Sequence, residues 1–264
     1  MSESTYHTSV LLQECLTGLA IKPDGIYVDV TFGGGGHSKA ILAELGPEGR
    51  LYAFDQDPDA WKQADLIDDD RLTLITANFR YLEKYLRLQG VKQVDGILAD
   101  LGVSSFQLDA AERGFSTRFD GPLDMRMGPS ASTSAAEVLN TYSVGDLQKL
   151  FGMYGEIKNA KTLALAVVQA RTQKPLETTG EFKKILFKLA PRNKEFRYFA
   201  QAFQAIRIEV NQELKVIEEF LEQSPKVLAS GGRLCVISFH SLQAQILFQI
   251  AEIGRYQRQT IIIN

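Results

Sequence analysis

The chain has 264 residues, of which 45% are hydrophobic and 23% are charged. This composition excludes an intrinsically disordered protein, and the length suits one large domain with an insertion or two domains. The net charge of −3 excludes a uniformly basic nucleic-acid binder. The charge is uneven, however, because residues 158–197 hold ten Lys or Arg against three Glu, so this segment carries +7 and the rest carries −10.

Cysteine and histidine usage excludes several kinds of site. The two cysteines, Cys15 and Cys235, lie in apolar segments and form neither a disulfide framework nor a CxxC metal motif. The three histidines lack metal-ligand spacing, so no metal is expected. There is no signal peptide and no apolar run near the ~18 residues that span a bilayer. We therefore expect a cytoplasmic protein that does not act at a membrane.

Strands and helices alternate along the first hundred residues. The apolar run Ile26 to Phe32 is short and rich in β-branched and aromatic residues, and four glycines end it, which predicts a buried strand. Ser38 is positioned to cap the helix that follows. The same patterns predict further strands at 50–55, 71–76, 94–101 and 231–239, with helices through Trp61 and over 81–88. The chain therefore predicts a Rossmann-like, doubly wound α/β sheet.

The segment 106–205 interrupts this alternation and contains no convincing strand. Helices are expected near 135–140, 144–152, 157–171 and 180–189, two of them opened by capping boxes at Ser134 with Glu137 and Thr178 with Glu181. We therefore predict one domain made of 1–105 plus 206–264 and an inserted, mainly helical domain over 106–205. Its size indicates a large substrate.

One long helix is predicted from Glu195 to Leu221, leading the chain back to the sheet. The aromatic residues at 196, 199 and 203 are spaced for one helical face. Packing into a core is therefore a better explanation for them than stacking on RNA.

The glycine turn Gly33 to Gly36 predicts a ligand site at the carboxyl ends of the strands. The dinucleotide fingerprint G-x-G-x-x-G fails here, because its last position falls on Ser38 or Lys39. The first strand carries Asp29 near its end and the second ends in Asp55. These carboxylates would repel a pyrophosphate and attract a cation such as the sulfonium and ammonium of S-adenosylmethionine, with Asp55 on the ribose hydroxyls.

Polar residues also follow the later strands. Asp100 ends the fourth strand and is followed by a short loop with Ser104, while His240 follows the fifth. Asp100 is placed to accept hydrogen bonds from a ligand in the crevice, and His240 either faces that ligand or is satisfied by the backbone. Phe79, past the end of the third strand, suits either an adenine wall or packing under the next helix.

Several motifs resemble the bacterial 16S ribosomal RNA cytosine-N4 methyltransferases. The motifs occur in order from residue 7 to residue 242: His7 to Leu12, Gly25 to Ser38, Asp100 to Ser105, Arg113 to Ser116, Gly121 to Met127, Phe203 to Ile208 and Ser238 to Leu242. The resemblance implies an S-adenosylmethionine-dependent enzyme with catalytic residues at Asp100, Ser104 and His240. The cofactor contacts that we expect are Asp29, Gly35, Gly36, His37, Asp55, Phe79, Asp100 and Gln107.

The substrate is expected to lie on the insertion. The polar loop from Gln107 to Met127 suits a target-base pocket through Arg113, Asp124 and Arg126, although ion pairs that tie the loop down explain these residues equally well. In the basic segment we expect phosphate contacts at Lys183, Lys184, Lys188 and Arg192. Solvated helix faces are the alternative explanation for that charge.

The sequence thus predicts methylation of a cytosine N4 amine in small-subunit ribosomal RNA or a ribosomal particle. The exocyclic amine is a poor nucleophile, so most of the rate would come from positioning and electrostatics. Neither cysteine lies in the Asp100 loop, which argues against carbon-5 chemistry. The alternatives are a DNA or small-molecule amino methyltransferase, and a non-catalytic RNA-binding assembly factor that keeps the cofactor pocket.

The resemblance weakens past Leu242. The family continues with Glu-Asp-Arg and a basic tail, whereas this chain has Gln243-Ala-Gln245 and reaches Asn264. Residues 260–263 suit a short edge strand. A homodimer is also expected, although the divergent tail bears on any RNA or dimer contact made there.

Overall fold

The computed structural model describes residues 9–252, which form two compact units. The first unit contains the residues up to 102 and those from 214 onward, and the second contains residues 103–213. The sequence-based boundary after residue 105 lies close to the first limit. The other, before residue 206, falls inside a helix that belongs wholly to the second unit. The expected edge strand at 260–263 lies outside the described residues.

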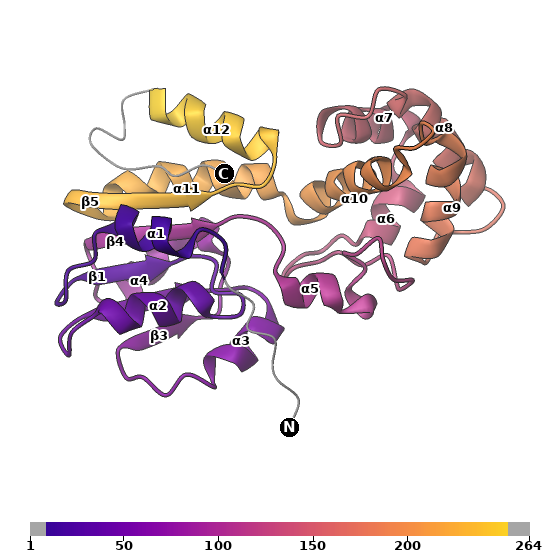
Figure 1. Cartoon of the computed structure of the whole chain (residues 1–264). Coiled ribbons are helices and arrows are strands. Elements are labelled where there is room, and N and C mark those ends of the chain that lie inside the picture. Colours follow the sequence, from indigo (N-terminus) through magenta and orange to yellow (C-terminus); the bar gives the residue numbers. More distant parts are fainter. Residues whose placement is uncertain (1–8, 253–264) are drawn as a thin grey trace. The chain divides into compact units, whose positions relative to one another are not determined.

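A five-stranded parallel sheet forms the centre of the first unit (Figure 1). Its strands, in the spatial order β3-β2-β1-β4-β5, are β1 (Ile26–Asp29), β2 (Arg50–Phe54), β3 (Leu72–Ile75), β4 (Val94–Asp100) and β5 (Leu228–Ile237). The order reverses between β1 and β4, and in such sheets ligands bind at the carboxyl ends of the strands beside this point. The predicted doubly wound fold is confirmed.

Helices cover both faces of this sheet because successive strand side chains point to opposite sides. Tyr27, Leu51 and Leu98 pack on one face with α1 (Leu12–Leu19) and α2 (Gly36–Glu44), and α3 (Pro58–Ala64) packs beside them over Ala53. The opposite face packs against α4 (Leu82–Leu88), α11 (Glu213–Val227) and α12 (Ser241–Glu252), with the short helix η1 (Phe79–Tyr81) leading into α4. The carboxyl ends of β1, β2 and β4 stay beside α2.

The second unit is helical. Its elements are α5 (Ser105–Asp109), η2 (Ala111–Arg113), α6 (Ala135–Thr141), α7 (Val144–Met153), α8 (Ala160–Arg171), α9 (Thr179–Leu189) and α10 (Glu195–Asn211). Within residues 103–213 the β structure amounts to one isolated bridge between Pro122 and Thr178, as expected from the sequence. Both predicted capping boxes form. Phe182 of α9 packs against Phe151 of α7 and Phe203 of α10, with ring centroids 6.2 and 5.8 Å apart.

The prediction of one long helix from Glu195 to Leu221 was wrong. Gln212 adopts a left-handed conformation (φ 51°, ψ 37°), which ends α10, and α11 begins at the next residue. The Arg207 guanidinium donates to both carboxylate oxygens of Glu213 at 2.6 and 3.1 Å, so an ion pair links the residues on either side of the break. Helical periodicity continues through the break, which is why the pattern alone missed it.

Two side-chain predictions were also wrong. Phe203 is buried and Phe199 is partly buried, but Phe196 is 86% exposed, because it lies in the first turn of α10, outside the core cluster. Ser38 does not cap α2, since Gly35 holds that position. Its hydroxyl instead donates to Asp29 Oδ2 at 2.7 Å.

No helix among residues 9–252 combines the length and the apolar character that crossing a membrane requires. The same residues contain no group of three or more His, Cys, Asp or Glu side chains arranged to hold a metal ion.

We predict that Ser38→Ala lowers the free energy of unfolding by about 1 to 3 kcal/mol, because it leaves a fully buried carboxylate without its hydroxyl donor. Urea unfolding measures the change. Thr172→Ala, which removes an exposed hydroxyl bonded to the preceding turn, serves as the control and should change stability by less than about 0.5 kcal/mol. Equal losses in the two variants would contradict the special role of the Ser38 hydroxyl.

Candidate active site

Three carboxylates lie at the carboxyl ends of three neighbouring strands. Asp29 ends β1, Asp55 directly follows β2, and Asp100 ends β4. Their positions alternate in step with Tyr27, Leu51 and Leu98, so all three are on the sheet face that α1 and α2 cover. We call these residues the carboxylate row.

Asp29 is the fully buried member of the row. Its Oδ1 accepts the Thr31 amide at 3.1 Å and its Oδ2 accepts the Ser38 hydroxyl. Burial raises the pKa of Asp29, although these hydrogen bonds and the His37 ring oppose the rise. Asp29 therefore links β1 to α2, and all its described partners come from the protein itself.

Asp55 holds the glycine turn in place. Its Oδ2 accepts the Gly33 amide and its Oδ1 accepts the Asp57 amide, both at 2.8 Å. Burial raises the pKa of Asp55 to about 6, and the Asp57 and Asp29 charges add to the rise. One lone pair on each oxygen remains for a further donor, as ribose binding requires.

Backbone conformation and close packing within the first unit explain the glycines at positions 35 and 36. Gly35 has φ +75°, and a Cβ there would also lie 2.8 Å from the Phe32 ring. A Cβ on Gly36 would meet the Ser9 hydroxyl. Both positions therefore require glycine for the tight entry into α2. Their contact with a cofactor stays a prediction.

Asp100 has an oxygen without a hydrogen-bond partner. Its backbone amide donates to the Thr31 hydroxyl at 2.7 Å, which fixes the end of β4 against β1. Among the described residues, its Oδ1 is buried and has no hydrogen-bond partner. Such atoms are rare in folded proteins and indicate a missing ligand or water. The carboxylate thus fits a donor group such as an amine or an ammonium.

His37 faces Asp100 from the first turn of α2. Its Nδ1 lies 3.7 Å from Asp100 Oδ2, and its Nε2 lies 3.0 Å from the Val10 carbonyl oxygen, to which it can donate. Burial raises the pKa of Asp100 to about 6; the His37 ring lowers it and the Asp29 charge raises it. Asp100 can therefore exchange a proton near neutral pH.

The turn after β5 contains the other predicted histidine. Ser238 and His240 follow β5 there, and the Asp100–Ile237 pairing places this turn beside the end of β4. The Ser238 hydroxyl is buried and, within residues 9–252, has no hydrogen-bond partner. Gln243 is buried and its Oε1 accepts the Phe239 amide at 3.1 Å, so the residue that replaces the family's acidic position closes this turn. Both residues were noted in the sequence motifs, but no role was predicted for either.

Phe79 is partly buried at the start of η1. Its ring meets Phe220 of α11 edge-on, with centroids 5.4 Å apart. One side of the ring packs in the core while the residue keeps some exposure, so Phe79 suits both core packing and an adenine wall.

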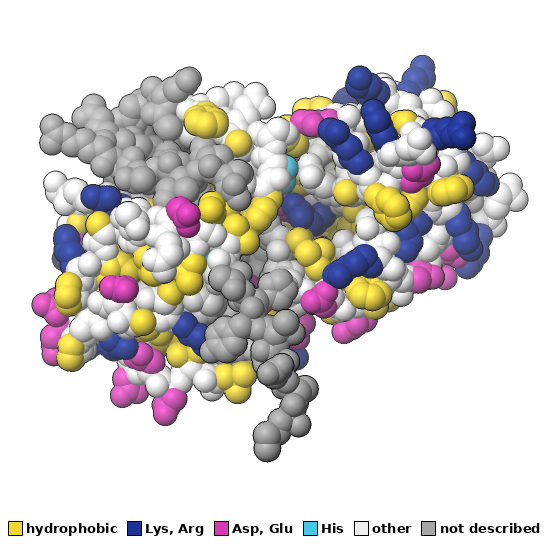
Figure 2. Space-filling view, viewed as in Figure 1, with side chains coloured by type: hydrophobic (Ala, Val, Ile, Leu, Met, Phe, Trp, Pro, Cys, Tyr) yellow, Lys and Arg dark blue, Asp and Glu magenta, His cyan; other side chains and the backbone are white. Residues whose placement is uncertain are grey.

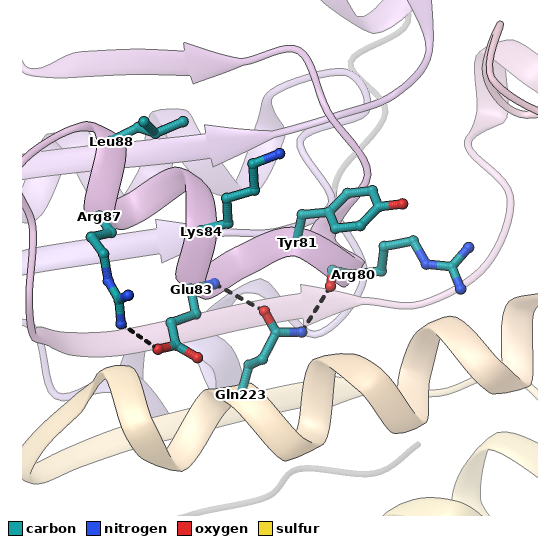
Figure 3. A pocket seen from close by; sticks show the side chains of 7 residues that line it. All are labelled: Arg80, Tyr81, Glu83, Lys84, Arg87, Leu88 and Gln223. Carbon is teal, nitrogen blue, oxygen red and sulfur yellow. Dashed lines mark hydrogen bonds and ion pairs between the residues drawn. The ribbon is translucent and has the colours of Figure 1, made fainter.

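A hollow beside Phe79 carries no chemistry of its own. It is lined by side chains of η1, α4 and α11, some of which form hydrogen bonds or ion pairs with one another (Figure 3). The Gln223 amide donates to the Arg80 carbonyl at 2.7 Å and accepts the Glu83 amide at 3.0 Å, and Arg87 pairs with Glu83 at 2.6 Å. The Gln223 bonds hold η1 and α4 against α11, whereas the Arg87–Glu83 pair lies within α4.

The other predicted site residues belong to the second unit. Ser104 and Gln107 form a capping box at the start of α5: the Ser104 hydroxyl accepts the Gln107 amide at 3.2 Å, and Gln107 Oε1 accepts the Ser104 amide at 3.1 Å. This is the S-x-x-Q pattern, which the sequence analysis recognised elsewhere but not here. Their catalytic and cofactor roles stay predictions.

The polar loop of the second unit is tied down by its own charges. Arg126 forms a two-point ion pair with Asp124 at 2.9 and 2.7 Å, and Arg113 donates to the Arg126 carbonyl at 3.0 Å. Asn211, which the sequence analysis did not single out, bonds to Met125 and Met127 at 2.8 Å each. The structural explanation thus accounts for the Asp124–Arg126 pair.

Lys183, Lys184, Lys188 and Arg192 do not share one environment. The Lys183 ammonium donates to the carbonyls of Thr117 and Phe119 at 3.1 and 3.0 Å, so it closes the loop. The other three are exposed. Of the predicted phosphate contacts, these three stay available to a ligand.

The cysteines are not nucleophiles at neutral pH. Both are buried, and burial raises the pKa of each thiol to about 12. A covalent adduct through a thiolate is therefore excluded for both.

We predict that Asp100→Asn stabilises the protein above pH 6. A carboxyl whose folded-state pKa is raised contributes stability below its unfolded pKa and loses it as the pH rises through about 6. The wild-type chain should thus lose about 1 to 3 kcal/mol between pH 4 and pH 7.5 relative to the variant. Urea unfolding across this range measures the difference. Asp70→Asn, at an exposed position, should show none, and a pH-independent difference for Asp100→Asn would contradict the assignment.

The sequence is similar to known methyltransferases. The model of the MraW methylase family matches residues 4–255. A ribosomal RNA small subunit methyltransferase H of Cytophaga hutchinsonii is 55% identical over 95% of this chain and 84% of its own length, and that of Flavobacterium johnsoniae is 54% identical over 96% and 83%. Among solved structures, Aeropyrum pernix fibrillarin with bound S-adenosyl-L-methionine gives a TM-score of 0.28 at 18% identity, covering 60% of this chain and 63% of its own. That structural similarity is too low to support an argument, whereas the family match extends over nearly all of the sequence: the chain belongs to the MraW methylase family.

Proposed function

We propose that this protein transfers a methyl group from S-adenosylmethionine to the N4 amine of a cytosine in small-subunit ribosomal RNA. The observation that carries the proposal is the carboxylate row, in which a buried Asp100 oxygen has no hydrogen-bond partner among residues 9–252. Membership of the MraW methylase family and the names of the relatives support the reaction and the substrate.

The carboxylate row fits a cationic methyl donor. Three neighbouring acids, two with pKa values raised to about 6, gain ionic stabilisation from a cation at the strand ends. S-adenosylmethionine supplies an activated methyl group on a positively charged sulfur when it is bound. Asp55 accepts the ribose hydroxyls, Asp29 keeps the turn rigid, and Phe79 gives the adenine an apolar wall.

Asp100 positions the target amine. Its Oδ1 accepts one N–H of the amine, which holds the nitrogen lone pair toward the methyl carbon. The nitrogen–carbon bond would form as the sulfur–methyl bond breaks and S-adenosylhomocysteine leaves; the nitrogen, now positively charged, would release a proton to Asp100, whose raised pKa suits an acceptor. His37, whose Nδ1 lies 3.7 Å from Asp100 Oδ2, lowers the pKa of Asp100 and so favours its ionised form. His240, in the turn beside the end of β4, would orient the base, and Ser104 stays a catalytic residue predicted from the sequence alone.

The second unit receives the RNA. Its exposed cations Lys184, Lys188 and Arg192 suit phosphate groups, and Arg113 suits the target nucleotide. A ribosomal particle is the expected form of the substrate, which places the protein in the cytoplasm. A homodimer is a further proposal, which light scattering of the purified chain tests.

Transfer of labelled methyl to small-subunit particles tests the proposed reaction. We expect label in ribosomal RNA, and digestion to nucleosides should recover it on cytidine N4. An assembly factor that kept only the pocket would bind S-adenosylmethionine without transferring label, and label on free DNA would favour a DNA enzyme.

We predict that Asp55→Ala and Asp100→Ala fail in different ways. Asp55→Ala should weaken S-adenosylmethionine binding by about 1 to 3 kcal/mol through lost charged hydrogen bonds, whereas Asp100→Ala should slow transfer more than it weakens binding. Calorimetry and single-turnover transfer measure the two effects, with Asp70→Ala as the unaffected control. Unchanged affinity in Asp55→Ala, or equal losses in Asp100→Ala, would contradict these roles.

A further inference from the structure

Two phenylalanines on the second unit are exposed far more than a core residue should be. Phe187, in the last turn of α9, is 67% exposed, and Phe196, in the first turn of α10, is 86% exposed. Between them runs the short connection 190–194. The buried aromatic residues of the same helices, Phe182 and Phe203, show that the core is already filled without these two rings.

Four cationic residues lie close to the two phenylalanines in the sequence. Lys184, Phe187 and Lys188 are spaced i, i+3 and i+4, so they share one face of α9, and Arg192 and Arg197 are on either side of the start of α10. All four cationic side chains are exposed. Figure 2 shows Lys and Arg side chains concentrated, with hydrophobic side chains between them, on the unit that contains α7, α8 and α9. We call Lys184, Phe187, Lys188, Arg192, Phe196 and Arg197 the α9–α10 edge.

The acids of this region are already occupied. Glu181 pairs with Lys174 at 2.7 Å, Glu177 contacts the same ammonium at 3.9 Å, and Glu195 accepts the Asn193 amide at 3.1 Å. Within residues 9–252, none of the four cations of the edge forms an ion pair, in contrast to Arg118 and Arg126, which pair with neighbouring aspartates. Residues 184–197 contain a single acid, Glu195, so the edge presents a net positive charge to solvent.

This combination distinguishes between two classes of partner. A protein interface favours exposed aromatic residues but is depleted of lysine. A single-stranded nucleic acid uses both features, because cations contact the phosphates and each base offers a face for stacking on an aromatic ring. A duplex would use the cations alone, because its bases are already stacked on one another.

We propose that the α9–α10 edge binds a single-stranded segment of RNA, with bases stacked on Phe187 and Phe196 and phosphates on Lys184, Lys188, Arg192 and Arg197. The inference rests on the proposed function for the identity of the nucleic acid. It extends that function by proposing that the RNA nucleotides bound at the edge are unpaired. Single-stranded RNA is the proposed ligand because its phosphates complement the positive charge and its bases can stack on the two exposed rings.

Fluorescence anisotropy with a labelled single-stranded oligouridine and a matched RNA duplex tests the proposal in the full-length protein. Each Phe→Ala substitution should weaken single-strand binding about 5-fold or more and leave duplex binding unchanged. Phe→Trp should retain binding, whereas Phe→Leu should lose it, because leucine is apolar but has no π face. Phe248→Ala is the matched control, since Phe248 is 57% exposed in the first unit.

Salt dependence separates stacking from charge. Lys188→Ala should reduce the slope of log affinity against log salt by about 1, whereas Phe196→Ala should leave the slope unchanged. If Phe→Ala leaves oligouridine binding intact, or if Phe→Leu binds as well as wild type, the stacking proposal is overturned. A change of oligomeric mass in the Phe→Ala variants, measured by light scattering, would overturn it in favour of a protein interface.

The oligouridine-binding experiment and the methyl-transfer experiment can fail independently of each other. If the wild-type protein binds oligouridine through the two rings but transfers no labelled methyl to particles, the proposal for the edge stands and the proposed methyl transfer is contradicted. Wild-type chain that labels particles while Phe187→Ala and Phe196→Ala bind oligouridine normally would contradict the edge alone.

Discussion

The first unit depends on holding partly desolvated carboxylates at the ends of three adjacent strands. Asp29 is fully buried, Asp55 accepts two backbone amides, and Asp100 keeps one buried oxygen unpaired. Burial raises the pKa of all three, so the fold maintains these charges at a cost in stability. Strained electrostatics of this kind is typical of binding and catalytic sites, because a cationic ligand offsets the cost.

The surrounding elements follow from this constraint. The Ser38 hydroxyl and the Thr31 amide donate to Asp29. The Thr31 hydroxyl accepts the Asp100 amide and so fixes β4 against β1. Asp55 accepts the Gly33 amide and so fixes the glycine turn. The turn requires glycine at position 35 because of its positive φ, and this entry angle brings His37 opposite Asp100. The second unit adds a different kind of surface, where uncompensated cations and exposed aromatic rings replace buried acids.

Sequence patterns predicted the strands, the helical insertion and the three acids, because those features depend on local periodicity and on residue type at strand ends. They could not predict the break at Gln212, since α10 and α11 share one helical period and only the backbone angle separates them. They placed Phe196 in the core for the same reason: periodicity gives a face but not where the neighbouring core ends. Ser38 was predicted to cap α2 but bonds to Asp29, whereas the capping role of Ser104 at α5 was not predicted. The sequence does not distinguish these cases, because a hydroxyl near a helix start can either cap the helix or bond across to another element.

Proton release on binding S-adenosylmethionine tests most directly whether the carboxylate row receives a cation. Calorimetry near pH 6, repeated in buffers of different ionisation enthalpy, measures it. We expect wild-type protein to release protons as Asp55 and Asp100 ionise beside the ligand, and Asp100→Asn to release fewer. Binding without proton release, or with proton uptake, would contradict a site built on these charges.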